Sequence, residues 1–378
     1  MSIKPDPARY IMVGGFLGAG KSTAIAKLAE FLDQRHYRVG LITNDQGQQL
    51  VDTLNLKQKG FQVEEIPGGC FCCRFNSLVD AADQLSKDQT PDLFIAEPVG
   101  SCTDLVASVS YPLRRIYGER FTIAPLNVLI DPRRASAILG VTQGKTFSEK
   151  VVYIYLKQIE EADQIVINKK DLLGEAALAA LKAALTERFP GKPIVAISAR
   201  TGEGLESWFE SLLAAEQSQA QPMALDYGIY AEGEALLGWL NATVNLHSEK
   251  LFDGDAWLAD FALAVQRRLE SQNVDVAHFK MTLEPSDGSG ELAVLNLVGT
   301  AFQPELAQTL SDPLTTGQLI INLRAEGLPE ALENSVKEGL EAMRWEALEL
   351  QLDHLECFQP APPTPVYRMD ASGHPVGP

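Results

Sequence analysis

The segment G-F-L-G-A-G-K-S at residues 15–22 decides the fold of the N-terminal half of this chain. It satisfies the pattern G-x-x-x-x-G-K-[ST], follows an apolar strand at residues 9–14 and opens a helical pattern at residues 21–34. In that context the glycines let backbone N–H groups turn inward around phosphates, and the helix N-terminus adds partial positive charge. The segment therefore predicts a phosphate-binding loop. A glycine-rich turn without a ligand is the alternative.

Strand and helix patterns alternate through the N-terminal half of the chain. Further strands are expected at residues 38–43, 61–66, 92–96, 123–130, 164–167 and 193–197, and helices at residues 77–86, 149–162 and 175–188. Strands that alternate with helices indicate βαβ units and a largely parallel sheet. We therefore expect an α/β P-loop NTPase domain at residues 1–218, with a mostly parallel sheet flanked by helices.

The pattern changes after a polar, Gln-rich segment at residues 214–223, which reads A-A-E-Q-S-Q-A-Q-P-M and is typical of a linker. Beyond it, strands are expected at residues 234–246, 278–283, 291–297 and 318–323, and helices at residues 255–271 and 329–343. We expect a smaller α+β domain with an antiparallel sheet at residues 226–350. The Pro- and Gly-rich residues 356–378 are expected to form a loosely held tail.

Charge is distributed unevenly along the chain, whose net charge is −18. Residues 1–220 hold 24 Lys and Arg against 26 Asp and Glu, whereas residues 221–378 hold 8 against 24. The acidic half repels phosphate backbones and anionic membranes, so neither a nucleic acid nor a membrane is expected as a partner. It suits a basic protein partner or a metal cation, and an acidic surface that only keeps the protein in solution is the other interpretation.

The sequence also indicates the cellular compartment. No run approaches the roughly 18 to 20 apolar residues that a membrane helix needs, and the N-terminus shows no secretory signal pattern. The cysteines are odd in number, and three of the five fall within four residues. That usage fits reduced thiols better than a disulfide framework, so a cytoplasmic location is expected.

The phosphate-binding loop and the helix that follows it supply the first candidate binding residues. Lys21 is expected to reach the β- and γ-phosphates, Ser22 to ligate Mg²⁺ through its hydroxyl, and Thr23 to meet the α-phosphate. The residues expected to contact the phosphates are Gly15, Gly18, Ala19, Gly20, Lys21, Ser22 and Thr23.

Two later segments indicate that the nucleoside triphosphate bound at this loop is GTP. The segment N-K-K-D at residues 168–171 ends a strand, where Asp171 can accept two hydrogen bonds from guanine that adenine cannot donate. Lys169 is expected to lie along the base plane, and Asn168 to tie the loops together. The segment S-A-R-T-G-E-G-L then places the backbone N–H groups of Ser198 and Ala199 at guanine O6. A solvated helix cap is the alternative interpretation of N-K-K-D.

Candidate hydrolytic residues lie between these segments. The strand L-F-I-A-E-P-V-G at residues 93–100 places Glu97 where it can hold a Mg²⁺-bound water and Gly100 where its N–H can sense the γ-phosphate. In T-N-D-Q-G, Asp45 can ligate Mg²⁺ or orient the attacking water. The expected catalytic set consists of Lys21, Asp45 and Glu97. Asp131 either faces this site or forms a turn before a proline.

The E-P-V-G loop also indicates the rate of turnover. It offers no adjacent Gln to orient water, and no arginine finger stands out in the sequence. GTPases that lack such charge stabilisation are slower by roughly 10³- to 10⁵-fold. Slow intrinsic GTP hydrolysis is therefore expected.

A cluster of thiols in the segment G-G-C-F-C-C at residues 68–73 predicts a metal site. The C-x-C-C spacing lets Cys70, Cys72 and Cys73 converge from one tight loop. Soft ligands of this kind suit Zn²⁺, Cu⁺, cobalt or nickel, and three of them leave a fourth position open for transfer of the metal. The alternative is a set of reduced, buried thiols without a metal.

For other residues near the cluster, an ordinary structural role explains the sequence as well as a metal-binding role does, or better. Glu64 and Glu65 precede the loop and can assist it, but a solvated strand edge explains them equally well. Cys102 follows the E-P-V-G loop and is expected to be a small buried residue. No role is assigned to Cys357.

Together these motifs resemble the CobW-like family of P-loop GTPases, whose relatives include GTPases that insert nickel into hydrogenase and urease. The resemblance covers most of residues 9–213, including the C-x-C-C motif that marks the CobW-like proteins. It implies a metallochaperone whose metal and nucleotide sites are coupled, with GTP and Mg²⁺ as cofactors and a client metalloprotein or cofactor-synthesising enzyme as partner. Two features depart from the family pattern: Pro98 and Val99 replace a hydroxyl-rich pair, and no His-rich stretch is present.

Three candidate functions follow from these motifs. The first is a GTP-hydrolysing metallochaperone, for which a nucleotide-dependent homodimer is a candidate assembly. The second is a GTP-gated assembly or activation factor for a cofactor-dependent enzyme, without a transferable metal. The third is a small-molecule kinase, against which N-K-K-D and the S-A segment argue.

Overall fold

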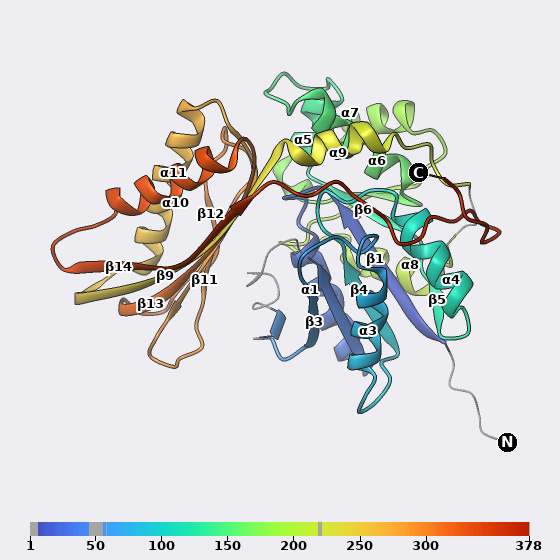
Figure 1. The fold of residues 1–378 in the computed structure, drawn as a ribbon, viewed down its shortest axis with the longest axis horizontal. Coiled ribbons are helices and arrows are strands. Elements are labelled where there is room, and N and C mark those ends of the chain that lie inside the picture. The colour runs from blue at the N-terminus through green and yellow to red at the C-terminus, as the bar shows by residue number, and fades with distance from the viewer. Residues whose placement is uncertain (1–6, 45–55, 58, 218–220, 378) are drawn as a thin grey trace. The chain divides into compact units, whose positions relative to one another are not determined.

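The computed structural model describes residues 7–44, 56–57, 59–217 and 221–377, which divide into two compact units (Figure 1). The first unit comprises the described residues up to 44, residues 59–231 and residues 363–377. The second unit comprises residues 56–57 and 232–362. The chain therefore enters the second unit twice, first at residues 56–57 and then at residues 232–362, and returns to the first unit after each.

The first unit is built on the expected parallel sheet, with the strand order β3-β2-β4-β1-β6-β7-β8 and β5 paired with β1. The strands are β1 (Ala8–Gly15), β2 (Val39–Asn44), β3 (Gln62–Ile66), β4 (Leu93–Glu97), β5 (Phe121–Ile123), β6 (Asn127–Ile130), β7 (Gln164–Ile167) and β8 (Ile194–Ala196). Every pairing is parallel. This confirms the predicted fold class.

Helices connect these strands. They are α1 (Lys21–Gln34), α3 (Phe75–Leu85), α4 (Tyr111–Tyr117), α5 (Pro132–Ile138), α6 (Glu149–Glu161), α7 (Glu175–Arg188), α8 (Leu205–Ala214) and α9 (Tyr227–Ala235), with a π-helix η1 (Val106–Ser110) and a 3-10 turn η2 (Lys170–Leu172). The central strand β4 is buried along its whole length. Parallel strands covered on both faces read as continuous apolar runs, which is why the sequence revealed them.

One expected strand proved to be two. The apolar run at residues 123–130 is divided between β5 and β6, which pair with different parts of β1. Pro125 lies between them, and proline has no N–H to donate to a strand ladder. The apolar pattern continued through this break, so it suggested a single strand.

The second unit contains the expected antiparallel sheet, with the order β12-β11-β10-β13-β9-β14. Its strands are β9 (Leu237–Phe252), β10 (Asp275–Pro285), β11 (Ala293–Leu297), β12 (Glu305–Gln308), β13 (Leu314–Glu326) and β14 (Leu348–Phe358). Helices α10 (Gly254–Ser271) and α11 (Pro329–Ala342) pack on its hydrophobic core. The β9 residues Leu240, Ala242, Val244 and Leu246 alternate into that core, as the period of a strand requires.

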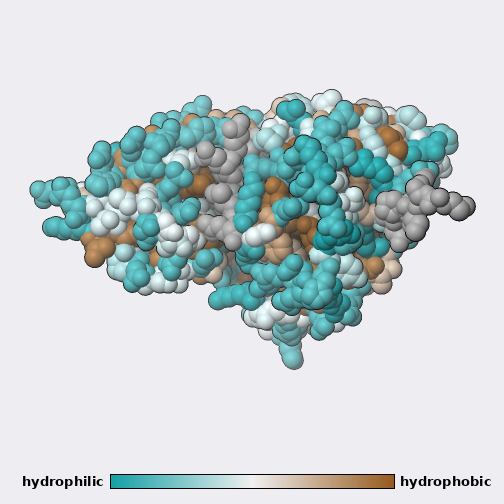
Figure 2. Space-filling view, turned by 90° about the horizontal axis from the view of Figure 1, so that it is seen from below, coloured by the Kyte–Doolittle hydropathy of each residue, from teal (hydrophilic) through white to brown (hydrophobic). Residues whose placement is uncertain are grey.

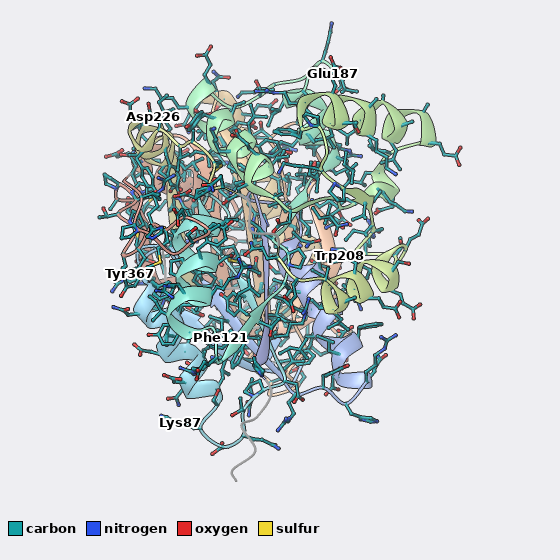
Figure 3. All side chains as sticks on the ribbon, turned by 90° about the vertical axis from the view of Figure 1, so that its right-hand side faces the viewer. Lys87, Phe121, Glu187, Trp208, Asp226 and Tyr367 are labelled. Carbon is teal, nitrogen blue, oxygen red and sulfur yellow. The ribbon has the colours of Figure 1, made fainter. Side chains whose placement is uncertain are left out.

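The C-terminal segment, residues 363–377, is held against the first unit rather than loosely attached as expected. The Val366 N–H donates to the Cys72 carbonyl at 2.9 Å, and the Met369 N–H donates to the Ala107 carbonyl at 2.9 Å. The ring of Tyr367, which is labelled in Figure 3, packs edge-on against Phe75, with 5.1 Å between ring centroids. These contacts join residues far apart in the sequence, so local composition could not indicate them.

The face of the molecule shown in Figure 2 is mostly polar, and hydrophobic residues form only small patches on it. Among the described residues, no helix combines the length and hydrophobicity that crossing a membrane requires.

Candidate nucleotide and metal sites

The phosphate-binding loop joins β1 to α1 in a conformation that only glycine adopts easily. Gly15, Gly18 and Gly20 have φ angles of 132°, 78° and 85°. A Cβ on Gly15 would lie 2.2 Å from the Leu129 carbonyl oxygen, and a Cβ on Gly20 would lie 2.5 Å from Asn168 Nδ2. The loop is therefore a bare-backbone cradle at a helix N-terminus, a geometry suited to phosphate.

Lys21, Ser22 and Glu97 meet beside this cradle, because β1 and β4 are neighbours and end at the same edge of the sheet. Lys21 is buried, and its Nζ lies 3.9 Å from Glu97 Oε1. The Ser22 hydroxyl donates to the same oxygen at 3.0 Å. A hydroxyl and a carboxylate are oxygen donors of the kind that Mg²⁺ prefers. Asp45, the remaining member of the expected catalytic set, lies outside the described residues.

The E-P-V-G loop touches the phosphate-binding loop directly. Gly100 is buried, and a Cβ there would lie 2.7 Å from Leu17 Cδ2. Gln158 on α6 donates from Nε2 to the Gly100 carbonyl at 3.0 Å and to the Cys102 carbonyl at 2.8 Å. A movement of the phosphate-binding loop would therefore reach the segment that carries Cys102 through a single contact, between Leu17 and Gly100.

Asn168 bridges the two loops that the sequence placed around the nucleotide. Its Nδ2 donates to the Ala19 carbonyl at 2.9 Å, and its Oδ1 accepts from the Ala199 N–H at 3.0 Å. Ser198 is buried, and its Oγ accepts from the Thr201 N–H at 3.1 Å. Asp171 is exposed on η2, and Thr23 is exposed on α1.

Lys169, which is partly exposed, pairs with the buried Asp131 beside the cradle. Lys169 Nζ donates to the Gly18 carbonyl at 2.8 Å and to Asp131 Oδ2 at 2.9 Å. Asp131 also caps α5 by accepting from the Arg133 and Arg134 N–H groups. Burial alone would raise the pKa of Asp131, but Lys169 and Arg134 outweigh it and hold that pKa below its usual value. Asp131 is therefore both the turn residue and a neighbour of the site.

An Asn168→Ala variant tests how the two loops are held. It leaves a buried carbonyl and a buried N–H without their partner, which costs about 1–3 kcal/mol each. We expect lower stability in denaturant unfolding together with weaker GTP binding. Asn127→Ala is the matched control, because Asn127 is also buried and accepts from Trp208 Nε1 at 2.7 Å away from these loops. Equal GTP affinities in the two variants would show that Asn168 only stabilises the fold.

The thiol cluster lies between β3 and α3. The sulfurs of Cys70, Cys72 and Cys73 lie within 4.8 Å of one another, and no other such group of metal-ligating side chains occurs among the described residues. The separations are 2.8 Å for Cys70–Cys72, 3.2 Å for Cys70–Cys73 and 3.7 Å for Cys72–Cys73. Three soft donors at this spacing can bind one transition-metal ion.

Hydrogen bonding within the cluster differentiates the thiols. Bonds from Cys102 first, then from Cys72 and Cys73, hold the pKa of Cys70 well below its usual range. The bond to Cys70 raises the pKa of Cys72 well above its usual range, and that of Cys73 to about 11. The hydrogen bonds within the cluster therefore favour ionisation of Cys70 over that of Cys72 and Cys73.

Neighbouring residues shape the cysteine loop. Asn44 at the end of β2 donates from Nδ2 to the Gly69 carbonyl at 2.6 Å and to the Ile66 carbonyl at 2.8 Å. Arg74 donates from Nε and Nη2 to the Gly68 carbonyl, both at 3.2 Å. The Thr364 N–H donates to Cys73 Sγ at 3.2 Å. The strand that leads towards Asp45 thus ends in direct contact with the cysteine loop.

The structure adds residues that the sequence did not single out. Asp104 is buried at φ 64° and accepts on Oδ2 from Tyr227 Oη at 2.7 Å and from Arg368 Nε at 2.8 Å. Glu161 accepts from Thr103 Oγ1 at 3.2 Å and from the Val106 N–H at 3.3 Å. Both carboxylates fix the segment after Gly100, and no short motif marks them.

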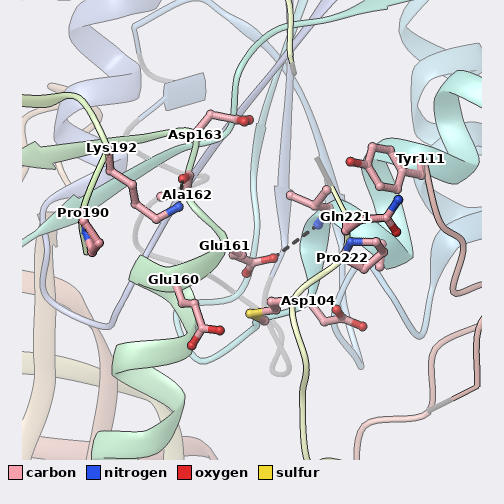
Figure 4. Close-up of a pocket in the computed structure, with 14 residues that line it drawn as sticks. Asp104, Tyr111, Glu160, Glu161, Ala162, Asp163, Pro190, Lys192, Gln221 and Pro222 are labelled. Carbon is pink, nitrogen blue, oxygen red and sulfur yellow. Dashed lines mark hydrogen bonds between the residues drawn. The ribbon is translucent and has the colours of Figure 1, made fainter. Parts of the chain in front are cut away.

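These carboxylates border a cavity of about 310 Å³ in the first unit (Figure 4). Burial first, and then the charge of Asp104, raises the pKa of Glu161 well above its usual range. In the close-up, Glu161 points towards the backbone of η1, to which it is bonded. The residues that line the cavity include Asp104 and Glu161 and none of the phosphate-binding loop.

The comparisons agree with this geometry. Residues 9–196 match the family described as CobW/HypB/UreG, nucleotide-binding domain. This segment therefore belongs to that domain family. The first unit of this protein therefore contains a P-loop GTPase domain of the CobW family, and the resemblance inferred from the motifs is confirmed.

Curated relatives match the CobW/HypB/UreG domain at modest identity. The zinc chaperone CobW of Sinorhizobium sp. is 28% identical over 214 residues, which are 51% of this chain and 59% of that protein. The zinc chaperone YjiA of Escherichia coli K12 is 28% identical over 178 residues, or 45% of this chain and 52% of that protein. The chain thus spans about half the length of the curated relatives it matches.

Among solved structures, the Zn(II)-bound YjiA GTPase from E. coli is similar to 90% of this chain over 100% of its own length. The sequence identity is 16% and the TM-score is 0.38.

Proposed function

We propose that this protein is a GTP-hydrolysing metallochaperone that carries a transition metal on Cys70, Cys72 and Cys73. The observation that supports it best is the convergence of three thiols on a loop that Asn44 ties to the end of β2. Zn²⁺ is the first candidate and cobalt or nickel the next, because thiolates are soft ligands and the curated relatives are named zinc chaperones. The metal is cargo, destined for a client metalloprotein or a cofactor-synthesising enzyme.

The residues of the nucleotide site have separate roles in this proposal. Backbone N–H groups of the cradle hold the phosphates, and the Lys21 ammonium neutralises charge on the β- and γ-phosphates. Ser22 and Glu97, with Asp45, would hold Mg²⁺, which would supply positive charge to offset the negative charge that develops on the phosphates. Lys169 and Asn168 fix the loops, so that Asp171 can pair with the guanine edge and Ser198 and Ala199 can meet guanine O6.

The acidic half of the chain supplies the client contacts in this proposal. Residues 221–378 hold 8 Lys and Arg against 24 Asp and Glu. Charge of one sign steers a complementary partner, and salt screens that attraction. Client association should therefore weaken as the salt concentration rises. Separately, light scattering in the presence of GTP and of GDP would show whether two copies of this chain form a dimer.

A second function is favoured by one observation, the burial of the thiols. Cys70 and Cys72 are buried, and the C-terminal segment bonds both Cys73 and the Cys72 carbonyl. A covered site suits a metal that stays in place. The protein would then be a GTP-gated activation factor for a cofactor-dependent enzyme rather than a carrier.

Metal measurements separate the two functions. We would measure Zn²⁺ stoichiometry and affinity in the GTP, GDP and nucleotide-free states, and the rate at which a chelator removes the metal in each. A carrier should bind one ion and release it at different rates in the GTP and GDP states. An ion released at the same rate in every state would favour the activation factor, and no bound ion would exclude the carrier.

Nucleotide choice can be tested at Asp171. An Asp171→Asn variant should weaken GTP binding by about 10- to 100-fold, the loss of charged hydrogen bonds worth about 1.5–3 kcal/mol. Discrimination should relax towards xanthine nucleotides, whose edge suits an amide. Calorimetric titrations with GTP, xanthosine triphosphate and ATP would measure this change. Equal affinities of the wild-type protein for ATP and GTP would contradict guanine recognition.

A further inference from the structure

The turn that follows β4 is held by one buried side chain, Gln158 of α6. Its Nε2 donates to the Gly100 carbonyl at 3.0 Å and to the Cys102 carbonyl at 2.8 Å, so both amide hydrogens are used. The Cys102 N–H donates to the Val99 carbonyl at 3.0 Å, which makes Gly100 and Ser101 the central residues of a tight turn. One amide therefore fixes the backbone on both sides of Ser101.

Two polar atoms at this turn make no hydrogen bond within the described part of the chain. Gln158 is 2% exposed and its Oε1 accepts nothing, and Ser101 is 0% exposed and its hydroxyl is also without a partner. Such atoms are uncommon in folded proteins, because burial takes away their hydrogen bonds to water. A hydroxyl and an amide oxygen that are both unpaired at one turn indicate a second arrangement in which they bond each other.

Helix α6 contacts both loops of the phosphate site with one face. Tyr155 packs edge-on against Phe16 of the phosphate-binding loop, with 5.7 Å between ring centroids, and Gln158 holds the turn at Gly100. Residues three positions apart lie on the same face of a helix. The helix therefore gives the two loops a common support, against which the turn can shift.

The turn is placed to respond to the γ-phosphate of GTP. A Cβ on Gly100 would lie 2.7 Å from Leu17 Cδ2 and 3.0 Å from the Leu17 nitrogen, so the turn packs directly on the phosphate-binding loop. Glu97, at the end of β4, accepts from the Ser22 hydroxyl at 3.0 Å. In GTPases the γ-phosphate orders such segments, and hydrolysis releases them. GTP and GDP should therefore leave this turn in different positions.

We propose that Gln158 is a positioning residue for the E-P-V-G loop, and that the Ser101 hydroxyl donates to Gln158 Oε1 when GTP is bound. This inference rests on the proposed function and deepens it, because it names a contact that holds the GTP state. In the GDP state the two atoms stay apart, in the arrangement that the structure shows. The additional hydrogen bond favours the GTP arrangement and is lost when the turn moves back after hydrolysis.

Affinities of the full chain for GDP and for a non-hydrolysable GTP analogue test this pairing. Ser101→Ala should weaken binding of the analogue by about fivefold, the value of one net hydrogen bond, and leave GDP affinity within about twofold. Thermal unfolding without nucleotide should be unchanged or slightly shifted upwards, because the deleted hydroxyl bonds nothing among the described residues. A serine that only supports the fold would instead lower stability and affect both nucleotides alike.

Ser108→Ala is the matched control. Ser108 is also 0% exposed and follows the same turn, but its hydroxyl donates to the Asp104 carbonyl, so its loss should lower the unfolding temperature and leave the ratio of the two affinities unchanged. Gln158→Met keeps the length of the side chain and loses the amide, and it should weaken the analogue more than GDP. Adding Ser101→Ala to Gln158→Met should not weaken the analogue further, as a double-mutant cycle requires of paired residues.

The outcomes separate this inference from the proposed function. An equal change in both affinities for Ser101→Ala, no change in either, or a larger loss for GDP would overturn the pairing and leave the GTP-hydrolysing metallochaperone standing. Failure of the wild-type protein to bind the GTP analogue would overturn both. Ser101→Ala decides even if Gln158→Met folds poorly, because it removes a hydroxyl that holds no other described residue in place.

Discussion

A Lys21→Ala variant is expected to lose GTP hydrolysis by at least about 10²- to 10³-fold, the usual result of deleting one preorganised donor at a developing charge. Lys21 is buried, and its ammonium is held beside Glu97 at the mouth of the cradle, so no solvent cation can replace it at the same position. Phosphate release under single-turnover conditions measures the loss. Nucleotide affinity should fall as well, because the phosphates lose their buried positive charge.

Lys27→Ala is the matched control for this variant. Lys27 lies on the same helix α1, but it is partly exposed and pairs with Glu30 at 3.0 Å. Its removal should leave turnover within about twofold, since exposed ion pairs contribute only about 0–1 kcal/mol. Residual hydrolysis in Lys21→Ala equal to that of Lys27→Ala would remove Lys21 from the catalytic set.

A Cys72→Ser variant is expected to lose the metal and, with it, any effect of nucleotide on metal binding. Loss of a residue that only supports a ligand typically costs about 10- to 100-fold in metal affinity, so loss of a ligand itself should cost more. GTP binding should remain, because Cys72 does not touch the phosphate-binding loop in the described structure. Competition with a chromophoric chelator measures the metal, and a fluorescent GTP analogue measures the nucleotide.

Thermodynamic coupling between metal binding and GTP binding provides a second test with the same variant. If GTP tightens metal binding in the wild-type protein, the metal must tighten GTP by the same factor, typically about 5- to 150-fold. Cys72→Ser should abolish both effects together, whereas Cys357→Ser should retain both. Identical metal affinity in the GTP, GDP and empty states of the wild-type protein would refute the coupling.

Metal affinity should fall as pH falls. The pKa of Cys73 is raised to about 11 and that of Cys72 is raised well above its usual range, so both carry protons at neutral pH and must release them when a metal binds. Each released proton makes affinity change about tenfold per pH unit. Titrations between pH 6 and 8 check this. A pH-independent affinity would show that the thiols are not the ligands.

Much of the first unit could be predicted because the sequence patterns that specify its elements each lie within a short stretch of the chain. An apolar run followed by glycines, a lysine and a serine specifies a strand, a turn and a helix within a short window, and α1 begins at the expected Lys21. The contact between Asn168 and the two loops was also foreseeable, since N-K-K-D ends a strand of the same sheet. The position of Asp45 relative to these residues stays a prediction.

The features that the sequence did not reveal depend on contacts across long stretches of chain. Cys102 is buried, as expected, but nothing in its own segment indicates that it influences Cys70. Arg368 lies in a Pro-rich stretch that suggested a tail, yet it forms a buried ion pair with Asp104. Strand β14 was missed because its mostly exposed residues show little of the apolar alternation typical of a half-buried strand.

Asp104 also cross-links two stretches of the first unit that are far apart in the sequence. Tyr227 lies before residues 232–362 in the chain and Arg368 lies after them, and both bond the same oxygen of Asp104. A single substitution of this buried carboxylate would therefore remove two long-range contacts of the first unit at once.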